Sequence, residues 1–171
     1  MRNSVLLILI ALSSAASAQA LPAKSVPLVN AHGEKAGKII LTEGPTGVLL
    51  HFEASGLTPG RHALHFHEKA DCSAPMFKSA GSHVHMTMPS VHGLLNPAGP
   101  DSGDLPNVFA DARGNVAAEI FAPSVTLRAG TARANLLDAD GSALIVHANP
   151  DDYSSQPIGG AGDRVLCAAI H

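Results

Sequence analysis

Short apolar runs separated by turn-forming residues dominate the chain after about residue 21. Eight such runs are rich in Val and Ile, and Gly, Pro, Asn or Asp bounds most of them, which is the pattern of β-strands. They span residues 25–30, 38–42, 48–54, 61–67, 116–121, 125–127, 143–147 and 164–170. No window of a dozen residues keeps a convincing helical period of 3.6. The pattern predicts an all-β sandwich or barrel.

Two long stretches between these runs do not fit strands. Residues 68–109 are rich in Gly, Pro, Ser and His, and residues 148–163 are rich in Asp, Gly and Pro. Irregular segments of this length in a compact domain are usually functional or disordered. Because they hold or flank most of the histidines of interest, we expect them to carry the function.

Residues 1–20 have the order of a secretory signal peptide. Arg2 precedes an unbroken apolar run of eight residues, and the segment ends in Ala18-Gln19-Ala20, a small-residue cleavage pattern. A membrane span needs roughly 20 apolar residues, so the run is too short for an anchor. We expect export, cleavage that leaves a single mature domain over 21–171, and no membrane attachment after cleavage; Ala16-Ser17-Ala18 is a rival cleavage site.

Composition narrows the class of protein. The chain has 11 Lys and Arg against 14 Asp and Glu, so it lacks the basic excess of a nucleic-acid binder. Hydrophobic residues make up 46% and the net charge is only −3, which favours a folded domain over disorder. In an oxidising compartment, the isolated pair Cys72 and Cys167 is most simply one disulfide. Two free thiols, or Cys72 as a metal ligand, are the alternatives.

Ten histidines are the unusual feature of the composition, and His is the commonest metal ligand. Alternate residues of a strand share a face, so His65 and His67 can converge on one ion. Such a pair is weak support by itself, because the chain contains two H-x-H sequences and many histidines. His147 at the end of the run 143–147 and His83 in the first long loop add imidazoles, and a nitrogen-rich site suits copper or zinc.

A second set of donors follows in the same loop. It comprises His83, His92, Asp101 and Asp104. Two imidazoles and two carboxylates could supply the nitrogen and oxygen tetrahedron that suits zinc.

Several ordered motifs cover nearly all of the mature chain. They are GLTPGRHALHFHEK at 56–69, DCSAP at 71–75, KSAG at 78–81, HGLLNP at 92–97, GDLPN at 103–107, VHANPDDY at 146–153 and QPIGGAG at 156–162, with Arg164 and Cys167. Together they resemble the copper/zinc superoxide dismutases, and specifically their bacterial exported branch, and they are far more specific than any H-x-H pair.

This resemblance implies a fold, an activity and a location. The fold would be an eight-stranded Greek-key β-barrel with long metal-binding and electrostatic loops. The activity would be the dismutation of superoxide to dioxygen and hydrogen peroxide by copper that cycles between Cu(II) and Cu(I), in the bacterial periplasm. The partner would be the superoxide anion as substrate, and the chain could assemble as a homodimer.

The resemblance also implies roles for individual residues. The implied copper ligands are His65, His67, His83 and His147. The implied zinc ligands are His83, which would bridge the two metals, His92, Asp104 and, at a position where the family has a histidine, Asp101. Asp151 would link the two metal sites, Cys72 and Cys167 would form the family disulfide, and Arg164 would hold the anion beside copper.

Three departures from the family pattern keep an alternative open. Asp101 replaces a histidine, residues 84–86 read Val-His-Met after the bridging histidine, and acidic Asp163 precedes Arg164. The zinc position could therefore be weaker, empty or filled by another ion, and His85 is a substitute ligand that we expect to face away from His83. The alternative function is an exported copper-binding or buffering protein on the same scaffold with little turnover.

Overall fold

The computed structural model describes residues 23–171, so the signal peptide predicted for residues 1–20 lies outside the described residues. This part of the chain folds into strands and one short 3-10 turn, η1 (Lys78–Ala80). The strands are β1 (Ala23–Asn30), β2 (Lys35–Glu43), β3 (Val48–Ala54), β4 (Gly60–His62), β5 (Leu64–His67), β6 (Val108–Ala110), β7 (Val116–Ala122), β8 (Val125–Thr126), β9 (Ala134–Asn135), β10 (Ser142–His147) and β11 (Arg164–Ile170).

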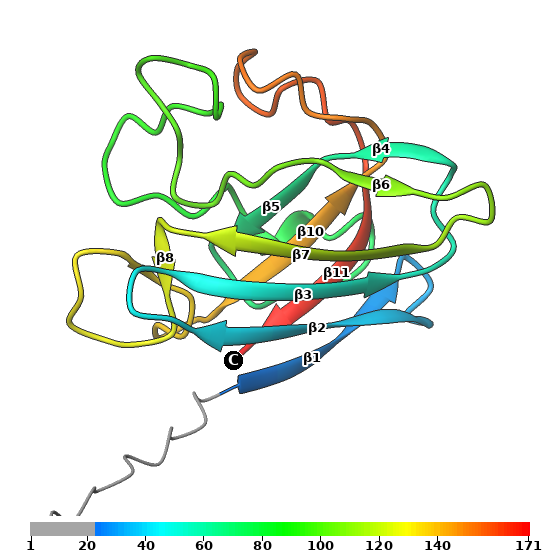
Figure 1. The fold of residues 1–171 in the computed structure, drawn as a ribbon, viewed down its shortest axis with the longest axis horizontal. Coiled ribbons are helices and arrows are strands. Elements are labelled where there is room, and N and C mark those ends of the chain that lie inside the picture. Colours follow the sequence, from blue (N-terminus) through cyan, green and yellow to red (C-terminus); the bar gives the residue numbers. More distant parts are fainter. Residues whose placement is uncertain (1–22) are drawn as a thin grey trace, which may run out of the picture.

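Seven strands form one curled sheet in the order β5-β10-β11-β1-β2-β3-β7. Its neighbours are all antiparallel, while the small β4–β6 pair is antiparallel and the β8–β9 pair parallel. In Figure 1 the sheet wraps round, so that β5, β10 and β11 lie behind β3 and β7, and the two long loops project together from one end. The prediction of an all-β barrel or sandwich is confirmed.

The predicted run 61–67 is divided between two sheets. His62 pairs with Val108 of β6, whereas Leu64 pairs with Val146 of β10. Between them Ala63 belongs to neither strand: its N–H donates to the Asn149 carbonyl, and its own carbonyl accepts from the N–H of His147 at the end of β10, each at 2.9 Å. The chain therefore changes sheets at Ala63, and this corner places the imidazoles of β5 beside β10.

Packing explains why some strands alternate in polarity and one does not. Strand β3 alternates between buried and more exposed positions, because one of its faces lies on the barrel core with Leu50 and Phe52 fully buried. Strand β10 is buried along its whole length. Its second face is covered by the loop around η1, where Phe77 packs against Ile145 and Cys167.

The loop around η1 is tied covalently to the sheet. Cys72 and Cys167 form a disulfide with their Cα atoms 5.7 Å apart, as predicted.

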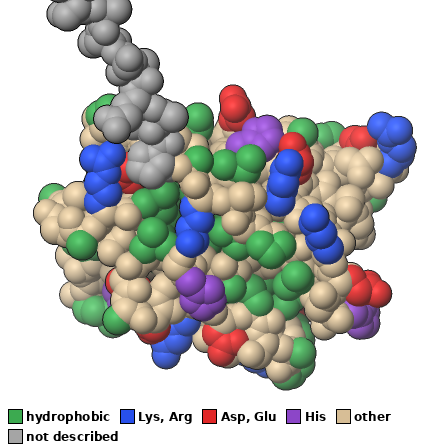
Figure 2. Space-filling view, turned by 90° about the horizontal axis from the view of Figure 1, so that it is seen from below, with side chains coloured by type: hydrophobic (Ala, Val, Ile, Leu, Met, Phe, Trp, Pro, Cys, Tyr) green, Lys and Arg blue, Asp and Glu red, His purple; other side chains and the backbone are tan. Residues whose placement is uncertain are grey.

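On the face formed by β1 and β2, basic side chains are separated by apolar and uncharged ones (Figure 2). Within residues 23–171, no helix is long and apolar enough to cross a membrane.

Candidate metal centre

Neighbouring backbone segments bring four imidazoles together. Strand β5 supplies His65 and His67, and β10, which pairs with β5, ends at His147. The loop after η1 adds His83 through an isolated antiparallel bridge to His67. A backbone bond from Val84 N to Phe66 O, 2.9 Å long, holds this loop against β5.

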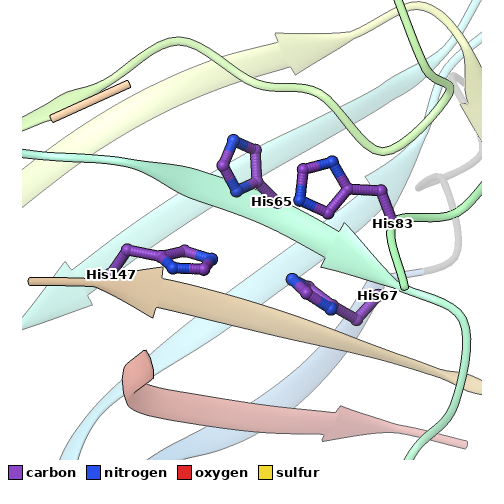
Figure 3. Close-up of side chains that lie close together, drawn as sticks. All are labelled: His65, His67, His83 and His147. Carbon is purple, nitrogen blue, oxygen red and sulfur yellow. The ribbon is translucent and has the colours of Figure 1, made fainter. Parts of the chain in front are cut away.

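The four rings present nitrogens to a common space (Figure 3). Their ligand atoms all lie within 4.8 Å of one another, and the four residues are buried. Four ring nitrogens there have no hydrogen-bond partner within the described residues, and Arg133 Nε elsewhere is the only other buried side-chain atom in that condition. They are His65 Nδ1, His67 Nε2, His83 Nε2 and His147 Nε2. Buried polar atoms are normally paired, so this convergence fits a metal ion held by four nitrogens.

The second nitrogen of each of three rings is fixed by an acceptor. His67 Nδ1 donates to the Gly81 carbonyl at 2.9 Å, and His147 Nδ1 donates to the Gly162 carbonyl at 3.1 Å. His65 Nε2 donates to Asp151 Oδ2 at 2.9 Å. Such contacts set the tautomer and orientation of a metal-binding imidazole, so each lone pair faces the common space.

Burial keeps two of these rings neutral. It lowers the pKa of His65 to about 4, even though the hydrogen bond to Asp151 opposes the change. Burial, reinforced by the neighbouring imidazole of His65, lowers the pKa of His147 to about 3. At neutral pH both rings offer lone pairs without first losing a proton.

A second group of donors adjoins the first and shares His65 and His83 with it. The ligand atoms of His65, His83, His92 and Asp104 also lie within 4.8 Å of one another. Asp104 Oδ1 accepts from His83 Nδ1 at 3.1 Å and from His92 Nδ1 at 2.8 Å. Asp104 Oδ2 accepts the backbone N–H groups of Gly93 and Asp101 at 2.8 and 3.0 Å. The chain thus aims one carboxylate oxygen at two imidazoles, a donor set that suits zinc.

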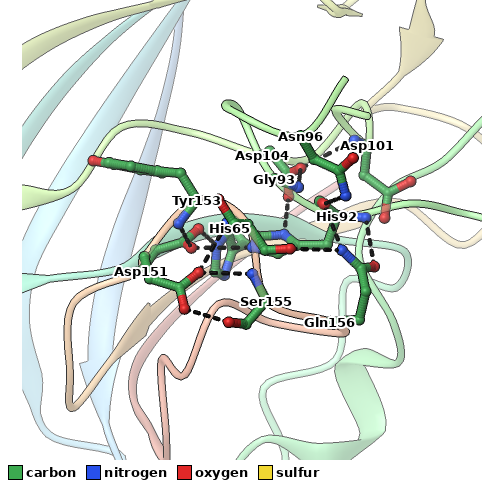
Figure 4. A network of polar contacts seen from close by, with 12 residues as sticks. His65, His92, Gly93, Asn96, Asp101, Asp104, Asp151, Tyr153, Ser155 and Gln156 are labelled. Carbon is green, nitrogen blue, oxygen red and sulfur yellow. Dashed lines mark hydrogen bonds and ion pairs between the residues drawn. The ribbon is translucent and has the colours of Figure 1, made fainter. Parts of the chain in front are cut away.

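Asp151 connects the two groups (Figure 4). Its Oδ2 accepts from His65 Nε2 at 2.9 Å, and its Oδ1 accepts from His92 Nε2 at 3.0 Å. Gly159 passes so close that a Cβ there, at φ +60°, would overlap Asp151 Oδ1.

Burial alone would lower the pKa of His92, but the carboxylates of Asp104 and Asp151 outweigh it and raise the pKa to about 9.

Two loop residues considered as ligands stand outside both groups. The carboxylate of Asp101 is buried, and burial and the nearby Asp104 raise its pKa. In Figure 4 the contact from Asp101 to Asp104 starts at the backbone nitrogen, while the Asp101 carboxylate lies apart. His85 donates from Nδ1 to the His83 carbonyl at 2.9 Å and lines a different cavity, with Glu68 and Met86.

Arg164 is anchored beside the four-imidazole group by two backbone carbonyls. Its Nη1 donates to Phe77 O and its Nη2 to Gly81 O, each at 2.7 Å. The Gly81 carbonyl also accepts from His67, so the guanidinium and one imidazole share an acceptor. Phe77 has a left-handed backbone at φ 55° and a buried ring next to the disulfide, which fixes where its carbonyl points.

A shallow cavity of about 200 Å³ opens at Arg164. It is lined by Met76, Lys78, Gly162, Asp163 and Arg164. Basic Lys78 and acidic Asp163 thus line the same cavity as Arg164, whereas Lys69 lines the separate cavity that includes His85.

Sequence reasoning missed the residues that join the two long loops. The Gln156 side chain accepts from His92 N at 3.1 Å and donates to His92 O at 2.8 Å. The Asn107 side chain likewise pairs with the backbone N–H and C=O of Asp151 at 2.9 Å each. Asn107 belongs to the GDLPN motif and Gln156 to the QPIGGAG motif. The signal that could have indicated their role was a polar residue at a fixed position in each of these loop motifs.

The sequence matches known proteins over most of its length. The family model for copper/zinc superoxide dismutase (SODC) matches residues 35–170. A superoxide dismutase [Cu-Zn] of Caulobacter vibrioides is 61% identical over 138 residues, which are 81% of this chain and 79% of that protein. A second such protein, from Aquifex aeolicus, is 44% identical over 144 residues, covering 84% of this chain and 83% of the relative.

Solved structures agree with the sequence matches. A SOD-like protein from Bacillus subtilis superposes with a TM-score of 0.80 at 38% identity, covering 86% of this chain and 97% of that one. The Cu/Zn superoxide dismutase from Brucella abortus gives a TM-score of 0.68 at 28% identity, covering 88% of this chain and 100% of that one. The chain belongs to the copper/zinc superoxide dismutase family.

Proposed function

We propose that this chain dismutates superoxide, turning two superoxide anions and two protons into one dioxygen and one hydrogen peroxide. The observation that carries the proposal is the convergence of four buried, unpartnered imidazole nitrogens within 4.8 Å. Arg164 stands beside them, sharing the Gly81 carbonyl with His67. Membership of the family supports the same reading.

We assign copper to the four-imidazole group and zinc to the second group. His65, His67, His83 and His147 would hold copper, since an all-imidazole set suits that ion. Bound copper supplies one-electron chemistry, because it cycles between two oxidation states and zinc does not. The zinc ligands would be His83, His92 and Asp104, with Asp101 as the remaining carboxylate of the set.

The chain's own groups bind the anion and manage a proton. The guanidinium of Arg164 can hold superoxide by charge-assisted hydrogen bonds, and its two carbonyl anchors keep it aimed. His83 contacts Asp104 through Nδ1 and leaves Nε2 without a protein partner. It can therefore hold a proton at Nε2 and release it to the product. Asp151 keeps His65 and His92 in fixed relative positions.

One experiment tests the proposal. The mature protein is loaded with copper and zinc, metal is counted per chain, and superoxide consumption is measured for the native sequence and for His147→Ala. His32→Ala, an exposed histidine in the β1–β2 turn, is the matched control. We expect activity that depends on copper, is lost in His147→Ala and is retained in His32→Ala. Copper binding without turnover would favour the buffering alternative, and no copper binding would refute both.

We also propose that the chain is exported to a bacterial periplasm and cleaved before Leu21. The signal-like residues 1–20 and the Cys72–Cys167 disulfide, which belongs to oxidising compartments, support this. N-terminal sequencing of the protein from a periplasmic extract tests it, and recovery of intact Met1 would contradict it. The homodimer stays a prediction, for which sedimentation of the metal-loaded chain is the measurement.

A further inference from the structure

Asp101 does not take the place that a full zinc ligand would need. The donor atoms of the second group, which lie within 4.8 Å of one another, come from His65, His83, His92 and Asp104, and the carboxylate of Asp101 is not among them. His65 is committed elsewhere, because its Nε2 donates to Asp151 and its unpartnered Nδ1 belongs to the four-imidazole group. The residue is only 8% exposed, so its carboxylate has not left the other donors by turning out into solvent.

The backbone keeps Asp101 where it is. Asp101 N donates to Asp104 Oδ2 at 3.0 Å, and Asp104 N donates back to Asp101 O at 3.2 Å. The first of these bonds is one of two that aim the Asp104 carboxylate, the other coming from Gly93. A shift of Asp101 toward the ion would disturb the orientation of Asp104, a residue that the site already uses.

Side-chain length adds to this constraint. An aspartate carboxylate ends nearer its own backbone than an imidazole nitrogen does, and the family resemblance places a histidine at this position. With the backbone fixed by the turn, the shorter side chain stops short of His83 and His92. The Asp101 carboxylate is therefore left out of the set of converging donor atoms.

We infer that the second metal position has three protein ligands, His83, His92 and Asp104, with Asp101 as an outer carboxylate, so that its zinc exchanges readily. Closed structural zinc sites have four protein ligands, whereas three leave a coordination position for water. The neighbouring group has four unpartnered nitrogens and would hold its ion by all four. The inference rests on the proposed function only in taking the second group as a metal position.

The test measures zinc loss, without superoxide. The full mature chain is loaded with one equivalent of copper and then one of zinc, and a chromogenic chelator reports the rate at which zinc leaves. The variants are Asp101→His, Asp101→Asn and Asp104→Asn, with Asp140→Asn in the exposed β9–β10 loop as the matched control. Copper content and the urea midpoint of each variant show that it is folded.

Zinc should leave Asp101→His at least about tenfold more slowly than the native chain, because the longer ligand closes the position. Asp101→Asn should lose zinc about 10–100-fold faster, the scale for a group outside the ligand shell, and Asp104→Asn more than about a hundredfold faster, because it removes a ligand. Asp140→Asn should match the native rate.

Two results would overturn the inference. One is equal acceleration in Asp101→Asn and Asp104→Asn, which would make Asp101 a full ligand. The other is an Asp101→His variant that is folded but holds zinc no longer than the native chain. Loss of dismutase activity with labile zinc would instead count against the proposed function alone.

Discussion

Replacing Phe77 by alanine separates the anchoring of Arg164 from metal binding. The Phe77 ring is 1% exposed and packs with Ala80, Ala143, Ile145 and Cys167 on the outer face of β10 and β11. Its backbone carbonyl accepts from Arg164 at 2.7 Å, and no atom of Phe77 belongs to either group of donors. The substitution should therefore leave copper in place and free the guanidinium.

The structure sets the size of both effects. Truncation of a buried Phe costs about 3–5 kcal/mol, and a small cluster under a surface loop can partly collapse, so we expect about 3 kcal/mol. A hydrogen bond to a charged group is worth about 1.5–3 kcal/mol. Since about 1.4 kcal/mol corresponds to a tenfold change, loss of one of the two Arg164 anchors should lower the rate of superoxide consumption about tenfold.

The assay compares Phe77→Ala with Phe121→Ala, a matched control whose ring on β7 is 50% exposed. Urea unfolding gives the free energy of unfolding, and superoxide consumption is normalised to bound copper. The control should change stability by no more than about 0.5 kcal/mol and keep its activity. A Phe77→Ala protein that is destabilised but fully active per copper would refute the claim that this loop positions Arg164.

Three further predictions concern the disulfide, the metals and a buried carboxylate. Removing the bridge between Cys72 and Cys167, 95 residues apart, should cost about 4.7 kcal/mol of unfolding free energy by loop entropy; a urea midpoint unchanged in the double serine variant would contradict this. Zinc should leave before copper as the pH falls from 8 to 4. Zinc must displace the proton of His92, whose two carboxylate partners outweigh burial and raise its pKa to about 9, whereas burial lowers the pKa of the copper-side His147 to about 3. Metal content after dialysis at each pH is the measurement, and copper leaving first would refute the prediction. Glu43→Ala should lower the free energy of unfolding by about 3–5 kcal/mol, because this carboxylate, 1% exposed, accepts from the Thr126 hydroxyl and pairs with Arg133 at 3.2 Å. A loss below about 1 kcal/mol in urea unfolding would show that the network is dispensable.

Local patterns in the sequence predicted most strands, because each strand's polarity reflects its own burial. The alternating run at 48–54 and the apolar run at 143–147 both correspond to strands. Strand β6 (Val108–Ala110) was missed within the predicted loop 68–109, since three residues are too few for a period of two to show. The run 61–67 was read as one strand, because the change of sheet at Ala63 depends on partners distant in the sequence.

The candidate site was predictable in its residue types and less so in its geometry. The histidines near 65 and 147 come together because β5 pairs with β10, a convergence that the family resemblance implied. The distance of Asp101 from the second group follows from a turn closed by its own backbone, and the role of Phe77 follows from a carbonyl direction. Neither a turn geometry nor a carbonyl direction is encoded in the type of a single residue.

The central claim is that four imidazoles share one copper ion beside an anchored guanidinium. The electron paramagnetic resonance spectrum of the chain loaded with one equivalent of Cu(II) tests it most directly, through the nitrogen hyperfine pattern and its change in His147→Ala. We predict a single copper species with four nitrogen donors that loses one donor in the variant. A mixture of copper species, or a spectrum that His147→Ala leaves unchanged, would contradict the account.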